Sequence, residues 1–161
     1  MKITTKTGDR GHTSLFGGRR VSKSSKFIEM VGSLDELQAN LGLCRHGVDE
    51  ESAAILEQVI DDIYRMMSIV GFEMKCPKNI EEIGEKDVEF LESSMRKYDV
   101  GELQEFVRPG STMEAARLHV ARTVCRRTER ELVKQGLEGE MLKYVNRLSD
   151  LLFVMAFRLE S

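Results

Sequence analysis

Three arginines in the C-terminal half of the chain recur at intervals of four residues, at Arg122, Arg126 and Arg130. On a helix, which advances about 100° per residue, they share one face with Glu129 and His119. Like charges at this spacing repel one another unless an anion relieves the repulsion. Two interpretations are open: an anion-binding site, or an arginine face that is solvated or paired across an interface.

The remaining sides of the same helix have different roles. A stripe of small and apolar residues adjacent to the arginines is suited to the protein core. This stripe consists of Leu118, Ala121, Cys125, Thr128 and Leu132. Arg117, Arg127 and Glu131 point roughly opposite to the arginine triplet. The simplest role for Arg117 and Arg127 is to keep the surface soluble.

The N-terminal segment, residues 1–26, has the composition of a phosphate-binding arm. Residues 5–14 interleave glycine, hydroxyl and basic side chains, which suit the wrapping of backbone amides around phosphate oxygens, although the Walker A pattern is absent. The arm carries a net charge of +6 and the rest of the chain −9. This asymmetry suggests a polyphosphate or nucleic-acid partner, with a solvated tail as the alternative.

The sequence gives no pattern for a site built from protein metal ligands, and we expect none. The three cysteines and three histidines lack the spacings of zinc, di-iron or redox disulfide sites. They are Cys44, Cys76, Cys125, His12, His46 and His119. No stretch approaches the about 20 apolar residues of a membrane span, so we expect no membrane segment and a cytoplasmic location.

Apolar residues that repeat in steps of three and four predict five helices within one domain, residues 1–161. The predicted helices cover about 27–44, 52–74, 88–98, 111–135 and 141–159. Ser111 and Glu114 have the spacing of a capping box for the fourth helix, and Gly136 is expected to end it. Nothing alternates with period two for long enough to require a sheet, although residues 2–7 could be extended. We therefore predict an all-α, five-helix up-and-down bundle over residues 27–161, preceded by the arm.

Two carboxylates on predicted helices need partners. Asp150 lies in the middle of the fifth helix, on a face with Asn146 and Phe153, and could pair with Arg147 or with an arginine of the fourth helix. Asp35 on the first helix has no basic residue within reach on its own helix. An arginine from another helix or another subunit could supply its partner.

Four blocks of sequence resemble, in order, the motifs of the PduO-type cobalamin adenosyltransferases. The first two are TKTGDRGHT at 5–13 and GSLDEL at 32–37. The third is FVRPG at 106–110, which leads into LHVARTVCRRTER at 118–130, and the fourth is YVNRLSDLLF at 144–153. Arg108 and the Ser111–Thr112 pair depart from the usual pattern. The resemblance spans nearly the whole chain.

This resemblance implies a homotrimer of five-helix bundles with the active sites between subunits. The substrates would be ATP, with Mg²⁺, and a corrinoid whose cobalt(I) takes the 5′-deoxyadenosyl group. By motif position, Asp35 would pair with Arg122 across the subunit boundary, and Phe106 would displace the lower cobalt ligand. The implied catalytic residues are Asp35, Phe106, Arg122 and Arg126. The implied ATP contacts are Thr5, Lys6, Thr7, Gly8, Thr13, Ser14, Lys23, Arg126, Arg127, Glu129, Arg130 and Asn146.

The resemblance further implies two protein partners, a reductase and an adenosylcobalamin-dependent enzyme. Two other functions compete with the enzyme. A non-catalytic ATP sensor would need none of Asp35, Arg122 and Phe106. A nucleic-acid-binding bundle is disfavoured, because the body is acidic and no aromatic residues are interleaved with the charges of the arm.

Overall fold

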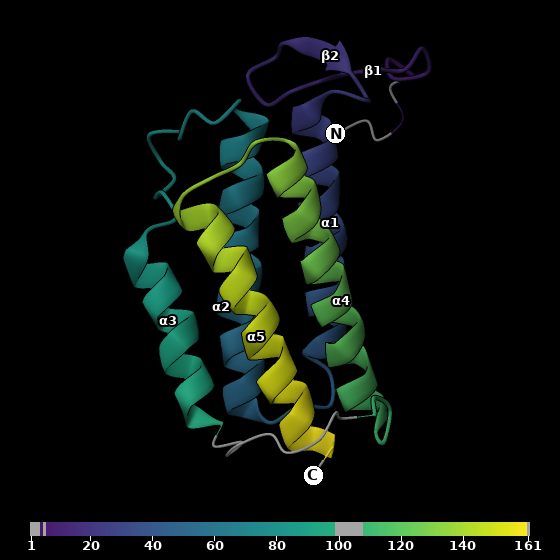
Figure 1. The fold of residues 1–161 in the computed structure, drawn as a ribbon. Coiled ribbons are helices and arrows are strands. Elements are labelled where there is room, and N and C mark those ends of the chain that lie inside the picture. The colour runs from purple at the N-terminus through teal and green to yellow at the C-terminus, as the bar shows by residue number, and fades with distance from the viewer. Residues whose placement is uncertain (1–3, 5, 99–107, 161) are drawn as a thin grey trace.

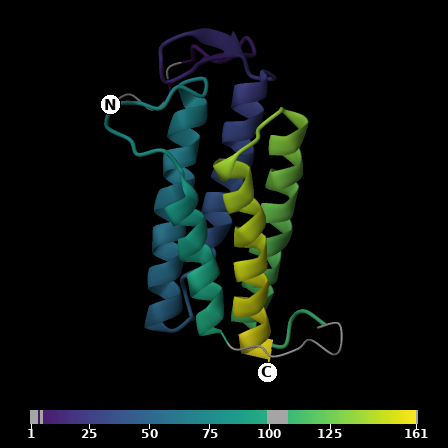
Figure 2. The same ribbon diagram turned by 60° about the vertical axis from the view of Figure 1, so that its left-hand side comes forward.

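The computed structural model describes residues 4, 6–98 and 108–160, so Thr5 and Phe106 lie outside the described residues. The described residues form five helices, which run alternately up and down, as Figures 1 and 2 show. They are α1 (Lys26–Cys44), α2 (Glu50–Gly71), α3 (Glu85–Lys97), α4 (Met113–Lys134) and α5 (Glu140–Glu160). The all-α five-helix bundle that the sequence predicts is confirmed.

The helices follow the order α2, α1, α4, α5, α3 around the core, because α1 packs on both α2 and α4, and α5 packs on both α4 and α3. Helix α4 is therefore held on two sides. Its predicted core stripe is confirmed: all five of its residues are buried. Two polar members of the stripe make hydrogen bonds there, Thr128 Oγ1 to Ser33 O at 3.0 Å and Cys125 Sγ to Val145 O at 3.2 Å. The rotation of α4 about its axis follows from this burial.

Several helix ends differ from the prediction by a few residues. Helix α4 is capped by Thr112, whose side chain accepts from Ala115 N at 3.1 Å, so the proposed capping box of Ser111 and Glu114 is wrong by one residue. Helix α2 ends at Gly71, three residues before the predicted end at residue 74, because the chain adopts positive φ at Glu73 and Met74. Gly136, with φ of 83°, ends α4 as predicted.

The described part of the arm contains a β-hairpin, which the sequence analysis missed. Strand β1 (His12–Ser14) pairs antiparallel with β2 (Arg20–Ser22), with Thr13 opposite Val21. Gly18, with φ of 81°, supplies the left-handed residue of the turn. Strands of three residues are too short to produce a recognisable alternation, which is why period-two analysis did not detect them. Among the described residues, no helix is both long enough and apolar enough to cross a bilayer.

A buried polar network ties α2, α3 and α5 together. Asp62 of α2 is 1% exposed and accepts from Tyr144 Oη at 2.8 Å and from Arg65 Nη1 at 2.7 Å. Arg65 also donates to Asp87 of α3 at 3.0 Å, and Asp87 in turn accepts from Gly84 N at 2.8 Å. Burial raises the pKa of the Tyr144 hydroxyl well above its ordinary value, with the neighbouring Asp62 adding to the shift. The positive charge of Arg65 therefore offsets the free-energy cost of burying the carboxylates of Asp62 and Asp87.

We expect Arg65→Met to destabilise the protein by about 3 kcal/mol, because it leaves Asp62 and Asp87 buried without their cation. The free energy of unfolding in urea measures the effect. Arg45→Met is the matched control: Arg45 pairs with Glu57 at the surface, where both side chains are more than two-fifths exposed, and its loss should cost less than about 1 kcal/mol. Equal losses in the two variants would show that the network is not a special source of stability.

Candidate active site

The hairpin is docked on the bundle by its turn. It lies over the end where α1 begins and α2 ends (Figure 1). Leu15 is buried, and Phe16 N donates to Gly71 O at 3.2 Å. The Phe16 ring lies 5.9 Å from the ring of Phe72, and Arg19 forms an ion pair with Glu73. The end of α2 thus supplies backbone, aromatic and charged contacts to the arm.

Residues of the docked arm line an open, basic pocket of about 680 Å³. It is lined by Lys6, Thr7, Asp9, Arg10, His12 and Arg20. Arg20 Nη2 donates to Thr7 O at 2.9 Å, which ties β2 to the turn that precedes the hairpin. A volume of this size with three permanent cations and one carboxylate suits a polyanion rather than an apolar ligand. Of the predicted ATP contacts, Lys6 and Thr7 line this pocket.

Other predicted arm residues lie close by. A side chain at Gly8 would place its Cβ 3.2 Å from Lys23 Nζ, so the missing side chain lets Lys23 lie against the loop. Lys23 N also donates to Gly11 O at 2.9 Å. Thr13 and Ser14 belong to β1. The structure therefore gathers Lys6, Thr7, Gly8 and Lys23 at one end of the bundle.

The arginine face of α4 divides into a covered part and an open part. Arg122 is half-buried, its guanidinium carbon lies 5.9 Å from the ring centroid of Phe153, and its Nε is buried without a hydrogen-bond partner in the described part of the chain. Arg126 and Arg130 are exposed. Neither makes an ion pair or hydrogen bond with another described residue. Two guanidinium groups one turn apart are thus available to an anion.

His119 occupies the covered part of this face. It is 5% exposed, and neither ring nitrogen has a hydrogen-bond partner among residues 4, 6–98 and 108–160. Its ring meets the Phe153 ring edge-on at a centroid distance of 6.4 Å, and Phe153 stacks on Phe157 at 6.3 Å. Burial lowers the pKa of His119, and the positive charge of Arg122 lowers it further. Neutral histidine, aromatic rings and one arginine therefore form a continuous surface between α4 and α5.

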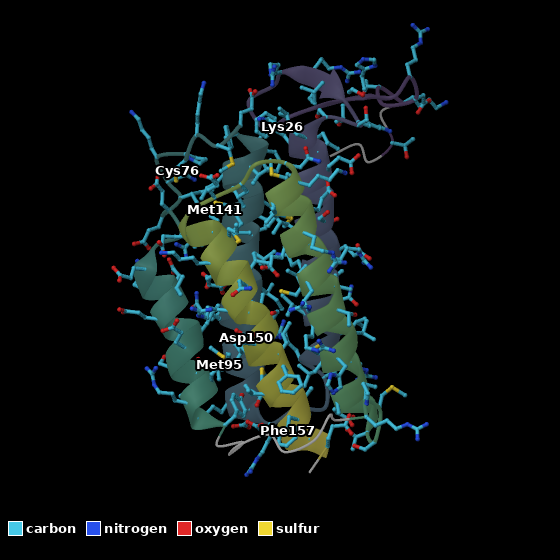
Figure 3. The ribbon with its side chains drawn as sticks, in the orientation of Figure 1. Lys26, Cys76, Met95, Met141, Asp150 and Phe157 are labelled. Atoms are coloured by element: carbon cyan, nitrogen blue, oxygen red, sulfur yellow. The ribbon has the colours of Figure 1, made fainter. Side chains whose placement is uncertain are left out.

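The predicted contact residue Asn146 on α5 points toward the arginine helix. Its Nδ2 donates to Glu129 Oε1 at 2.9 Å, while its Oδ1 accepts from Arg147 Nη1 at 3.2 Å. Arg147 pairs mainly with Glu92 on α3 at 2.8 Å. Asp150 lies exposed midway along α5 (Figure 3), and neither partner considered for it, Arg147 or an α4 arginine, forms an ion pair with it among the described residues.

Arg127 and Asp35 lie elsewhere. Arg127 points away from Arg126, as the helical periodicity predicted, and it turns toward α1, where it pairs with Glu36 at 2.5 Å. Asp35 is exposed on α1 and has no ion pair within the described part of this subunit. Within one chain, the structure does not bring Arg127 or Asp35 to the face formed by Arg122, Arg126 and Arg130.

Comparison with known proteins decides the family. The model for a family described as cobalamin adenosyltransferase matches residues 3–159. The chain belongs to this family. It is 39% identical to a corrinoid adenosyltransferase of Citrobacter freundii, over 96% of this chain and 93% of that protein. It is 37% identical to the corrinoid adenosyltransferase PduO of Salmonella typhimurium, of which it spans about half, 49%.

Solved structures agree with the family assignment. The chain superposes, with a TM-score of 0.85 and 26% identity, on a variant PduO-type ATP:corrinoid adenosyltransferase from Lactobacillus reuteri complexed with cobalamin and ATP. The match covers 99% of this chain and 93% of that chain. No cluster of three or more His, Cys, Asp or Glu side chains that could hold a metal occurs among the described residues of this family member.

The sequence analysis missed the residues that dock the arm, chiefly Phe16, Arg19 and Gly71. A signal for docking existed, because Leu15 and Phe16 form an apolar pair inside an otherwise polar segment. Arg20, which lines the pocket, was counted only as part of the charge of the arm. Its bond to Thr7 O depends on the hairpin register and has no signature in the sequence.

Gly71 provides a test of arm docking. We expect Gly71→Ala to displace Phe16, because an alanine Cβ would lie 2.5 Å from Phe16 Cδ2. Trypsin should then cleave after Arg19 and Arg20 roughly tenfold faster, since proteolysis follows the population of the open state. The urea midpoint of the bundle should not fall, because alanine favours helix over glycine.

Gly42→Ala in α1 is the matched control, because nothing lies within 4 Å of an added Cβ there. Cleavage of the arm should be unchanged in this variant. Equal cleavage rates in Gly71→Ala and the parent protein would contradict the docking role of Phe16.

Proposed function

We propose that the protein transfers the 5′-deoxyadenosyl group of ATP to the cobalt(I) of a reduced corrinoid. The observation that carries this proposal is the pair of exposed guanidinium groups, Arg126 and Arg130, in the C-terminal half of α4, which make no ion pair or hydrogen bond with another described residue. Thr128 Oγ1 bonds Ser33 O and so holds the C-terminal half of α4 beside the start of α1, from which the arm extends. Figures 1 and 2 both show the hairpin above this end.

In the proposed reaction the nucleophile is the electron pair of cobalt(I). It attacks C5′ of ATP, a cobalt–carbon bond forms, and the C5′–O bond breaks with release of inorganic triphosphate. The protein then needs neither a general base nor a covalent nucleophile, and it acts by positioning and by charge stabilisation. Lys6, Arg126 and Mg²⁺ would meet the charge that accumulates on the leaving triphosphate.

We assign residues 1–26 as the ATP-binding arm and residues 27–161 as the bundle of a single domain. The proposed ATP contacts remain those of the motif positions, from Thr5 to Lys23 in the arm and from Arg126 to Asn146 in the bundle. Arg127 needs a neighbouring subunit to bring the nucleotide within its reach, because in its own subunit it pairs with Glu36.

A homotrimer with sites between subunits would also explain two residues that one subunit leaves unpaired. Asp35 is exposed without an ion pair in the described chain, and Arg122 keeps a buried Nε without a hydrogen bond there. We propose that Asp35 of one subunit pairs with Arg122 of the next. A separate reductase would supply the electron for cobalt(II), an adenosylcobalamin-dependent enzyme would consume the product, and the reaction would take place in the cytoplasm.

The decisive assay is anaerobic. Purified protein is mixed with Mg-ATP and chemically reduced cob(I)alamin, and the visible spectrum is followed for the light-sensitive cobalt–carbon bond. We expect product formation that requires ATP and releases triphosphate. Tight ATP binding without product would instead indicate an ATP sensor.

Replacement of Arg126 tests the triphosphate site. We expect Arg126→Ala to lower kcat by about 10²–10³-fold, the cost of removing one donor to developing charge. The urea midpoint should not change, because Arg126 is exposed and makes no bond within the described chain. Arg117→Ala is the control on the same helix, since Arg117 donates to His46 O, away from this face. Near-full activity of Arg126→Ala would overturn the assignment.

Phe106 is proposed to displace the lower axial ligand of cobalt, because an electron-donating ligand opposes reduction of cobalt(II). We therefore expect Phe106→Ala to keep more activity with chemically reduced cobalt(I) than with cobalt(II) and a reductase. The measured quantity is the ratio of the two rates, relative to the parent protein. Equal losses in both assays would refute this role.

A further inference from the structure

The last residue of α5, Glu160, binds the backbone at the start of α4. Its Oε1 accepts from Gly110 N at 2.8 Å and its Oε2 accepts from Ser111 N at 3.0 Å. Both carboxylate oxygens are used, each by one amide. Glu160 lies fifty residues from Gly110 in the chain, so this contact joins the C-terminal end of the described chain to the beginning of the arginine helix.

The position of this carboxylate is unfavourable by itself. A negative charge at the C-terminal end of a helix opposes the helix dipole. The Glu160 side chain is also only 7% exposed, which adds to this cost. The two amides offset these costs, and hydrogen bonding from the Ser111 side chain, followed by that from the Gly110 amide, lowers the pKa of Glu160. The carboxylate is therefore charged at neutral pH and holds both amides.

Glu160 also closes one end of the aromatic surface between α4 and α5. His119 Nε2 lies 3.6 Å from Glu160 Oε1, beyond hydrogen-bond length but in contact. Through His119 and Phe153, the Glu160 carboxylate is linked by packing to Arg122. Phe157, one turn before Glu160, lies near the same end of α5 (Figure 3). The amides of Gly110 and Ser111 are thus connected to Arg122 through the packing of Glu160, His119 and Phe153.

We propose that Glu160 is a positioning residue for the corrinoid half of the active site. It acts through Gly110 and Ser111, which fix the point at which the chain that carries Phe106 joins α4. Phe106 precedes Gly110 by four residues. The inference rests on the proposed function, because that function gives Phe106 its role at the cobalt.

The test compares Glu160→Ala and Glu160→Gln with Glu140→Ala. Glu140 begins the same helix, forms an exposed pair with Lys143, and serves as the matched control. In Glu160→Ala we expect the amides of Gly110 and Ser111 to exchange hydrogen about tenfold faster, as loss of a charge-assisted bond predicts. Glu160→Gln keeps one acceptor oxygen and should show an intermediate effect. The control should leave the exchange unchanged.

The kinetic readout separates positioning from general stability. We expect Glu160→Ala to raise KM for cob(I)alamin about tenfold while KM for ATP and the urea midpoint stay unchanged. Loss of activity should be larger in the cobalt(II) assay than in the cobalt(I) assay, as for Phe106→Ala. Faster amide exchange with unchanged corrinoid kinetics, or an equal rise in both KM values, would overturn the positioning role.

The parent protein distinguishes failure of this proposal from failure of the proposed function. A parent protein that is active, with a Glu160→Ala variant that matches it, refutes only the role of Glu160. A parent protein that forms no cobalt–carbon bond from ATP and cob(I)alamin refutes the proposed function and, with it, the role of Glu160.

Discussion

The structure depends on burial of one narrow stripe of α4 between α1 and α5. Leu118, Ala121, Cys125, Thr128 and Leu132 are all buried, and the small side chains among them let the neighbouring helices approach. Once this stripe is buried, the rotation of α4 is determined, and so is the direction in which every arginine of the helix projects. Turning α4 by one residue would place a guanidinium group in the core, which is prohibitively costly without a partner.

The same burial gives the arginines different surroundings along a single face. Near the middle of α4, Phe153 of α5 covers Arg122 and His119 is buried beside it. Farther along, Arg126 and Arg130 remain exposed. The same helix therefore has an aromatic, poorly solvated surface around Arg122 and a solvated cationic surface around Arg126 and Arg130. The proposed function assigns the first to the corrinoid and the second to the triphosphate.

Two sets of polar contacts hold the rest of the molecule in place around this helix. The buried network of Asp62, Arg65, Asp87 and Tyr144 fixes α3 to α2 and α5, on the side away from the arginines. The contacts of Phe16 and Arg19 fix the hairpin to the end of α2. The first set is largely buried and contributes to global stability. The second is at the surface, where a single ion pair contributes little to global stability.

The sequence by itself determined the five helices, the core stripe of α4 and the clustering of Arg122, Arg126 and Arg130, because these follow from the 3.6-residue period and from burial of apolar area. It also carried the motifs that indicated the family, and the comparisons confirm that family. Only the tertiary structure decided which arginine of this face is covered, where the hairpin docks, and which residue binds the amides of Gly110 and Ser111. The covered arginine is Arg122, and the residue that binds the two amides is Glu160. These features join residues far apart in the chain, and no local periodicity encodes which segments will meet.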